Sequence, residues 1–225
     1  MNRLILSVCM TAALGVSIDA QAGGIPGVQD QIDALQSRIT ALESMLAGVA
    51  RDGDTLVFEG MNLQITNGMG ESDGVLDGQY LTNDWAVNGL GNLIIGYDEP
   101  GLLDAEKTGS HNLVVGVAST YTSYGSIVSG VFTGVTAPFG MAIGGFGNSA
   151  ESPYAVAVGG HSNHALATVS TVVGGLDNYA SGMFATVSGG SGNEASGEES
   201  TVSGGNQRNA TGERDWVAGS LFEDD

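Results

Sequence analysis

The side chains best suited to chemistry in this chain are two histidines separated by two residues, His161 and His164. Imidazoles at this spacing could contribute to a metal site, but such a site needs further ligands that converge on the same point. The sequence offers no cysteine and no other histidine nearby, so we expect both to be turn residues. A three-fold axis that gathers three copies of one histidine is the alternative. His111 replaces Gly91 of the preceding related segment, and the pattern assigns it no role.

Acidic residues in the loop-like stretches could bind calcium weakly. They are Asp52, Asp54, Asp73, Asp77, Asp98, Glu99, Asp104 and Glu106. The sequence contains no EF-hand loop, and its paired glycines lack the aspartate of calcium-binding nonapeptide repeats. Solvated surface charge is therefore the interpretation we favour. No Ser/His/Asp group or carboxylate pair can be assigned to a concave surface, and we predict no catalytic residue, no cofactor and no metal site.

These residues are positioned by a periodic array that occupies the C-terminal part of the chain. A glycine closes each of nine similar segments, at steps of 20, 14 and 14 residues and then five steps of 15. These glycines are Gly96, Gly116, Gly130, Gly144, Gly159, Gly174, Gly189, Gly204 and Gly219. Self-similarity at a fixed period predicts one structural unit stacked many times. We predict an all-β repeat protein, a parallel β-roll or β-helix with 15-residue rungs.

Alternate positions of each unit carry small side chains, which predicts a narrow interior. The residues that lie two positions before the closing glycines include Ala142, Ala157, Val172, Val187 and Val202. A column of asparagines follows the glycine pairs and consists of Asn148, Asn163, Asn178 and Asn193. Asparagine tolerates left-handed backbone, and stacked asparagines can form hydrogen bonds along an array. We therefore predict a structural asparagine ladder.

A helix with a heptad seam precedes the array. Its apolar residues repeat every seven positions in two series, Ile25, Ile32, Ile39 and Leu46, and Val28, Leu35, Leu42 and Val49. This seam predicts a short coiled-coil neck over residues 25–50, although a lone amphipathic helix on a globular core is the alternative. The heptads alone leave dimer and trimer open, because the core favours dimers whereas the segment 38–43 resembles three-stranded coils. The residues assigned to chain association are Ile32, Leu35, Arg38, Ile39, Leu42 and Glu43.

Residues 1–22 have the pattern of a secretory signal, with Arg3, an apolar run over 4–18 and cleavage after Ala22. A buried first helix or a membrane anchor is the alternative. The single cysteine, Cys9, lies inside this segment. We expect a secreted or cell-surface protein without direct membrane insertion. The formal net charge of −19, with only six basic residues, argues against nucleic acid and anionic lipid as partners.

The remaining boundaries follow from the change of period. Residues 54–124 are predicted to be an irregular start of the β-roll with acidic loops, 125–219 the regular repeats, and 220–225 a cap or tail. Strands are expected at 55–59 and 62–66, and a protruding loop at 97–108. Exposed aromatic residues are candidates for a ligand surface, namely Tyr97, Tyr121 and Tyr124, and packing against a neighbouring residue is the alternative for each of them.

Units such as STVVGGLDNYASG and ATVSGGSGNEASG resemble the head repeats of trimeric autotransporter adhesins, the YadA-like head. The resemblance is carried by the paired glycines and the four asparagines, and it is strongest over 125–219. It implies left-handed parallel β-rolls, three chains side by side, and binding of matrix proteins, host cells or other surfaces. In that family the head comes before the coil and a membrane barrel follows, whereas here the coil precedes the repeats and the chain ends without a barrel. We therefore carry over the fold and a surface-binding role, but not autotransport.

The sequence leads us to expect an exported, non-enzymatic, adhesin-like homotrimer that binds a matrix, cell-surface or glycan ligand. A narrow rung buries too little apolar surface to be stable alone, so sister chains should cover a second face. A structural fibre or spacer module without its own ligand is the first alternative. A small-ligand binder or sugar-active enzyme is the second.

Overall fold

The computed structural model describes residues 27–75, 85–100 and 105–219. The chain divides into two compact units between Leu63 and Gln64, and each unit is described by itself. The predicted signal segment 1–22 and the predicted tail 220–225 lie outside the described residues.

The first unit contains one helix and one β-hairpin. Helix α1 (Val28–Met45) is rich in good helix formers and carries Asp30 in its first turn, where a negative charge complements the helix dipole. Strands β1 (Val49–Asp52) and β2 (Thr55–Phe58) follow and pair antiparallel. Only Gly53 and Asp54 separate them, and the positive φ of Gly53 suits so tight a turn.

The hairpin corrects two boundaries predicted above. The neck was predicted to extend to residue 50, but the helix ends at Met45 and Val49 begins a strand. Gly48 explains this end, because its φ of 89° interrupts the helical backbone. The β-roll was predicted to start at residue 54, but Thr55 pairs with Asp52 of the hairpin instead. The strand predicted at 62–66 is also wrong, because those residues have no strand partner among the described part of the chain.

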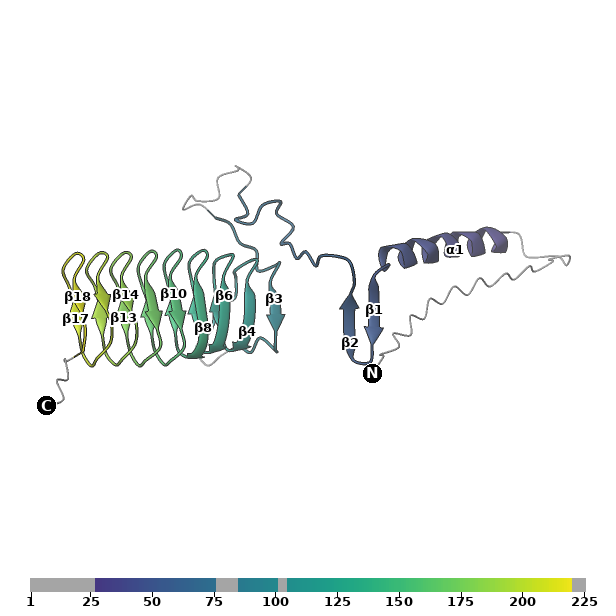
Figure 1. Ribbon diagram of the computed structural model, residues 1–225. Coiled ribbons are helices and arrows are strands. Elements are labelled where there is room, and N and C mark those ends of the chain that lie inside the picture. Colours follow the sequence, from purple (N-terminus) through teal and green to yellow (C-terminus); the bar gives the residue numbers. More distant parts are fainter. Residues whose placement is uncertain (1–26, 76–84, 101–104, 220–225) are drawn as a thin grey trace. The chain divides into compact units, whose positions relative to one another are not determined.

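The second unit is a β-solenoid built from two parallel sheets (Figure 1). The nine-stranded sheet contains β3 (Leu93–Ile95), β4 (Leu113–Val117), β6 (Ile127–Val131), β8 (Met141–Phe146), β10 (Val156–Val158), β12 (Thr171–Val173), β14 (Thr186–Val187), β16 (Thr201–Val202) and β18 (Trp216–Val217). The seven-stranded sheet contains β5 (Thr120–Tyr121), β7 (Gly134–Val135), β9 (Ser149–Ala150), β11 (His164–Ala165), β13 (Tyr179–Ala180), β15 (Glu194–Ala195) and β17 (Asn209–Ala210). From β4 on, strands from the two sheets alternate along the chain, so each pair makes one turn of the stack.

The strand register follows the spacing of the sequence. Leu93 pairs with Leu113 and Leu113 with Ile127, and Met141 then pairs with Val156. From there to β18, partners in the nine-stranded sheet lie 15 positions apart. The prediction of a stacked, all-β repeat is confirmed. The second, two-residue strand of each turn was not predicted, because two residues are too few to show a period.

The interior of the solenoid is narrow, as predicted. Each sheet contributes one fully buried column, Val128, Ala142, Ala157, Val172, Val187 and Val202 from one, and Val135, Ala150, Ala165, Ala180, Ala195 and Ala210 from the other. The small corner residues Ala155, Ser170, Ala185 and Ser200 are also buried. Side chains of this size let the two sheets approach closely and leave little room for a ligand between them.

Candidate functional site

The asparagine column runs through one corner of the solenoid and ties each turn to the next. The backbone N–H of Asn163 donates to Oδ1 of Asn148 at 2.9 Å, and the same bond joins Asn178 to Asn163 at 3.2 Å. Asn193 and Arg208 continue the series. All four asparagines are fully buried. The predicted ladder of Asn148, Asn163, Asn178 and Asn193 is confirmed as a structural feature.

The backbone around the ladder differs from the prediction in one respect. The left-handed residue is the one before each asparagine, including Ser162 at φ 53° and Asp177 at φ 57°, rather than the asparagine itself. The asparagine amide explains why the second residue of each glycine pair has to be glycine. A Cβ on Gly160 would overlap both the carbonyl oxygen of Gly175 and Nδ2 of Asn163, so only glycine fits there.

The outer surface of the nine-stranded sheet, which we call the apolar face, is the candidate interaction surface of the array. Its two outward columns are Leu93, Leu113, Ile127, Met141 and Val156, and Ile95, Val115, Ser129, Ile143, Val158 and Val173. A third column, Val117, Val131, Phe146, His161 and Leu176, runs beside them. Exposure reaches 56% at Ile95 and 46% at both Phe146 and Leu176. Exposed apolar side chains this contiguous are typical of a surface that contacts a partner.

The apolar face changes character toward the C-terminal turns. In register with Val156, the next positions are Thr171, Thr186 and Thr201. Beyond Leu176 its column continues with Ser191 and Asn206. Trp216 ends the first column and is 68% exposed. The apolar part of the face is thus limited to the turns that precede residue 177.

The outer surface of the seven-stranded sheet, which we call the polar face, carries a different set of side chains. His164 stacks on Tyr179 with ring centroids 5.0 Å apart and an interplanar angle of 11°. Nδ1 of His164 lies 2.8 Å from the hydroxyl of Ser149, and that hydroxyl donates to Glu151 at 2.7 Å. These contacts link the side chains of Ser149, Glu151 and His164 on this surface. The two outer faces of the solenoid therefore contrast, one apolar and one hydrogen-bonded.

Tyr179 also shows the effect of a carboxylate on this polar face. Its hydroxyl donates to Oδ1 of Asp177 at 2.8 Å, and this hydrogen bond raises the pKa of Tyr179 above the usual value for tyrosine. Glu194 adds a smaller electrostatic contribution in the same direction. The neighbouring carboxylates therefore favour the neutral form of this tyrosine.

The two histidines singled out from the sequence do not converge. His161 packs against Phe146, with ring centroids 5.0 Å apart, at the edge of the apolar face. His164 lies on the polar face and stacks on Tyr179. Among the described residues, no group of three or more histidine, cysteine, aspartate or glutamate side chains is placed to hold a metal ion. Each ring instead packs against a ring of a neighbouring turn.

The three candidate ligand-surface tyrosines differ in burial. Tyr97 is 93% exposed, as predicted. The exposure predicted for Tyr121 and Tyr124 is wrong, because each is only 2% exposed. Tyr121 is the inward residue of β5 and pairs with Val135. Tyr124 packs edge-on against Phe139 at a centroid distance of 5.1 Å.

Tyr121 instead helps to hold the loop inserted after β3. Its hydroxyl donates to Oδ2 of Asp98 at 2.9 Å. Burial, together with this hydrogen bond, raises the pKa of Tyr121 well above the usual tyrosine value. Lys107 forms an ion pair with Asp98 at 2.8 Å and donates to the backbone carbonyl of Glu99. The described ends of the loop are thus anchored to the solenoid.

The residues predicted to associate chains lie on helix α1 and are all exposed. Ile32 is 39% exposed, and the larger fractions at Leu35, Ile39 and Leu42 are 53–54%. Arg38 and Glu43 are exposed as well. Helix α1 contains no buried residue. A single chain therefore leaves the whole seam of the helix in contact with water.

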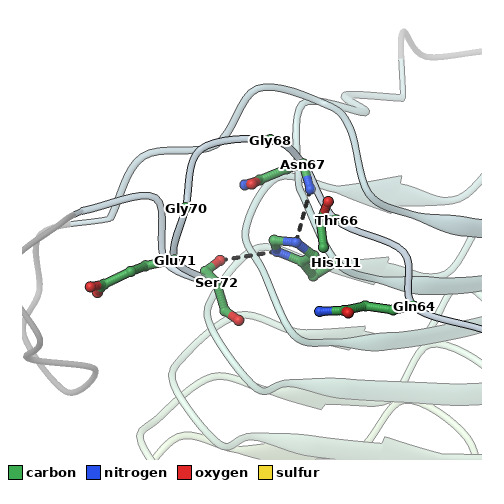
Figure 2. Close-up of a pocket in the computed structure, with 8 residues that line it drawn as sticks. All are labelled: Gln64, Thr66, Asn67, Gly68, Gly70, Glu71, Ser72 and His111. Carbon is green, nitrogen blue, oxygen red and sulfur yellow. Dashed lines mark hydrogen bonds between the residues drawn. The ribbon is translucent and has the colours of Figure 1, made fainter. Parts of the chain in front are cut away.

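Two structural features were not predicted from the sequence. His111 accepts a hydrogen bond from the backbone N–H of Asn67 and lies near the carbonyl of Ser72, so it joins two distant segments (Figure 2). A corner column of left-handed residues also repeats every 15 positions, with Phe139, Tyr154, Val169, Phe184, Glu199 and Arg214 at φ 57–62°. The column could have been noticed from its period, but its residue types do not signal left-handed backbone. Nothing in the repeat pattern points to His111.

Comparison with models of protein families, with curated proteins and with solved structures finds no match to this chain. We therefore infer the function from the fold and from the contrast between the two outer faces of the solenoid. In the part of the chain that the structure describes, no helix combines the length and apolarity needed to cross a bilayer.

Proposed function

We propose that this chain is an exported, non-enzymatic, adhesin-like protein whose β-solenoid heads associate as a homotrimer. In this proposal the solenoid is left-handed with 15-residue rungs, and residues 28–45 of each chain form a three-stranded coiled coil. The observation that carries the proposal is the contrast between the two outer faces of the solenoid. The apolar face is covered by sister chains, whereas the polar face remains available to solvent and ligand.

The energetics of the apolar face support this arrangement. Burying apolar surface contributes about 25 cal/mol per Å², and the face offers three parallel columns made mostly of Ile, Leu, Val, Met and Phe over the turns before residue 177. The exposed seam of α1 needs a partner for the same reason. A short coil is marginal alone, and two weak associating regions in one chain reinforce each other because the first contact raises the effective concentration of the second.

A matched pair of substitutions on one turn tests this trimer. Val158 and Leu166 have similar intermediate exposure, but Val158 lies on the apolar face and Leu166 on the opposite side of the turn. Val158→Lys should weaken the trimer in sedimentation, because it places a charge between chains. Leu166→Lys should leave the mass unchanged. Equal behaviour of the two variants would reject the apolar face as the interface.

The surface-binding role is proposed on the resemblance of the repeats to adhesin heads and on the open polar face. Screening the secreted form against immobilised matrix proteins and glycans separates an adhesin from a spacer. We expect saturable binding to at least one of them. A trimer that binds none of them, and that contributes only length to a fibre, supports the spacer alternative instead.

A further inference from the structure

The first compact unit has no core of its own. From Gly27 to Leu63 every residue is exposed except Val49, which is half-buried. A two-stranded hairpin is at best marginally stable in water unless a further strand or a packed apolar face supports it. A short helix is marginal for the same reason. The hairpin of β1 and β2 therefore needs a partner.

One side of this hairpin is apolar. Val49 pairs with Phe58 across the two strands, and Arg51 pairs with Leu56. Residues opposite each other project to the same side, as do residues two apart in a strand, so these four lie together. We call them the hairpin face. Leu56 is 58% exposed and Phe58 42%, whereas Arg51 lies at the turn, where its Nε donates to the carbonyl of Gly53 at 2.8 Å.

The other side of the hairpin offers less apolar surface. It carries Ala50, Asp52, Thr55 and Val57. Val57 is the only large apolar residue among them and is 37% exposed. A partner that excludes water would gain more by covering the hairpin face than by covering this side.

The junction with α1 keeps the hairpin next to the end of the helix. Only residues 46–48 separate α1 from β1 (Figure 1). The backbone N–H of Val49 donates to the carbonyl of Leu46 at 2.9 Å, and that of Glu59 donates to the carbonyl of Gly48 at 2.7 Å. Helices that associate through their seams would therefore bring the hairpins of their chains to a high effective concentration.

The heptad seam also continues into the hairpin face, which identifies the partner as a second copy of this chain. Val49 is the last member of the series that includes Leu35 and Leu42 at seven-residue steps, and it is the first residue of the hairpin face. Leu46 ends the other series and is 58% exposed. Because a parallel coil places equal positions of its chains at the same height, the same hairpin residues of each chain would meet at its axis.

We propose that the hairpin faces of three chains pack together around the axis of the α1 coil and form a second buried core directly after it. This inference rests on the proposed trimer and deepens it by naming the surface that continues the coil. It assigns residues 49–58 to chain association.

Cysteine cross-linking of the full chain tests the hairpin face. Cys9, the only cysteine, is replaced by serine in every variant. Leu56→Cys and Phe58→Cys place a thiol on the hairpin face, and Val57→Cys is the matched control on the other side of the same strand. A disulfide requires Cα atoms within about 7 Å of each other. Mild oxidation should therefore link two chains of each trimer in at least one of the first two variants, but not in the control.

A second pair of substitutions covers the case in which the cysteine variants do not fold. Leu56→Ser removes one buried apolar side chain per chain and should lower the association constant of the trimer at least about tenfold. Val57→Ser is the matched control and should change it much less. Sedimentation over a dilution series measures both association constants.

The proposal is overturned if the trimer forms but neither Leu56→Cys nor Phe58→Cys cross-links faster than Val57→Cys. Equal association of Leu56→Ser and Val57→Ser overturns it as well. In both cases the trimer itself, and with it the proposed function, still stands. A folded protein that sediments as a monomer at micromolar concentration overturns both, so the two failures are distinguishable.

Discussion

The backbone N–H of Asn163 donates to Oδ1 of Asn148 across 2.9 Å, from one turn of the solenoid to the next. In turn, Oδ1 of Asn163 accepts the backbone N–H of Asn178, and its Nδ2 donates to the carbonyls of Gly159 and Gly175. One fully buried side chain thus connects three successive turns. Because the backbone N–H of Asn178 and the carbonyls of Gly159 and Gly175 all bond to this amide, the ladder stabilises the stacking of the turns.

Replacing Asn163 with alanine should therefore be strongly destabilising. The substitution leaves the backbone N–H of Asn178 buried without its acceptor, at a cost of about 1–3 kcal/mol, and it also leaves a cavity where the buried side chain was. We expect a loss of about 3 kcal/mol in the free energy of unfolding, measured by urea denaturation. Asn206→Ala, at an exposed position, is the control and should change little. A loss below about 0.5 kcal/mol in Asn163→Ala would show that the ladder is dispensable.

The heptad seam of α1 should determine how many chains associate. Replacing Ile39 and Leu42 together with asparagine places two polar groups at positions that the proposed coil buries. We expect monomers to appear in sedimentation velocity at low micromolar concentration. The control is the pair Ser37→Asn and Thr40→Asn, which lies off the seam. A trimer that survives the Ile39 and Leu42 substitutions unchanged would remove the helix as the organiser.

The strand register should respond to the length of an insertion or deletion rather than to its site. One residue inserted between Val187 and Ser188 shifts every later inward side chain to the outer face, and a marked drop in melting temperature is expected. Deletion of residues 171–185 joins Ser170 to Thr186. Thr186 then takes the place of Thr171 as the strand partner of Val156. The shortened protein should still melt cooperatively. An unchanged melting curve after the insertion would contradict the stacked register.

Val169 should be a strained position that glycine relieves. It sits at φ 60°, where a β-branched residue is disfavoured, and is held there by the hydrogen bond from its N–H to the carbonyl of Pro153 at 3.0 Å. Val169→Gly should raise the free energy of unfolding by about 1 kcal/mol, since relief of strain exceeds the entropic cost of glycine. Val173→Gly, at a similarly exposed position in a strand, should lower it. The idea fails if both substitutions are equally destabilising in thermal melts.

The periodic part of this fold could be read from the sequence because each turn repeats the same choices. The buried column of the nine-stranded sheet, from Ala142 to Val202, was visible as alternate small residues before each glycine. The inward position of Tyr121 was also present in the pattern, because the alanine column extends backward from Ala150 through Val135 to Tyr121 in steps of 15 and 14. It was missed because an aromatic residue interrupts a column of small ones.

The non-periodic parts could not be predicted from the sequence. The heptad spacing continues to Val49, and only the left-handed backbone of Gly48 diverts the chain into β1. The partners of His111 lie 39 and 44 residues away in a segment without a period, so no local pattern brings them together. The bend of residues 67–72 that His111 holds depends on those long-range contacts and is a property of the folded chain alone.

The mass of the protein in solution tests the central claim most directly. If the apolar face and the α1 seam are buried between sister chains, sedimentation equilibrium at micromolar concentration should give three times the chain mass. On dilution, the trimer should dissociate and unfold together, so no folded monomer should appear. A compact, cooperatively folded monomer in dilute buffer would contradict the account, because it would show that these exposed apolar columns need no partner.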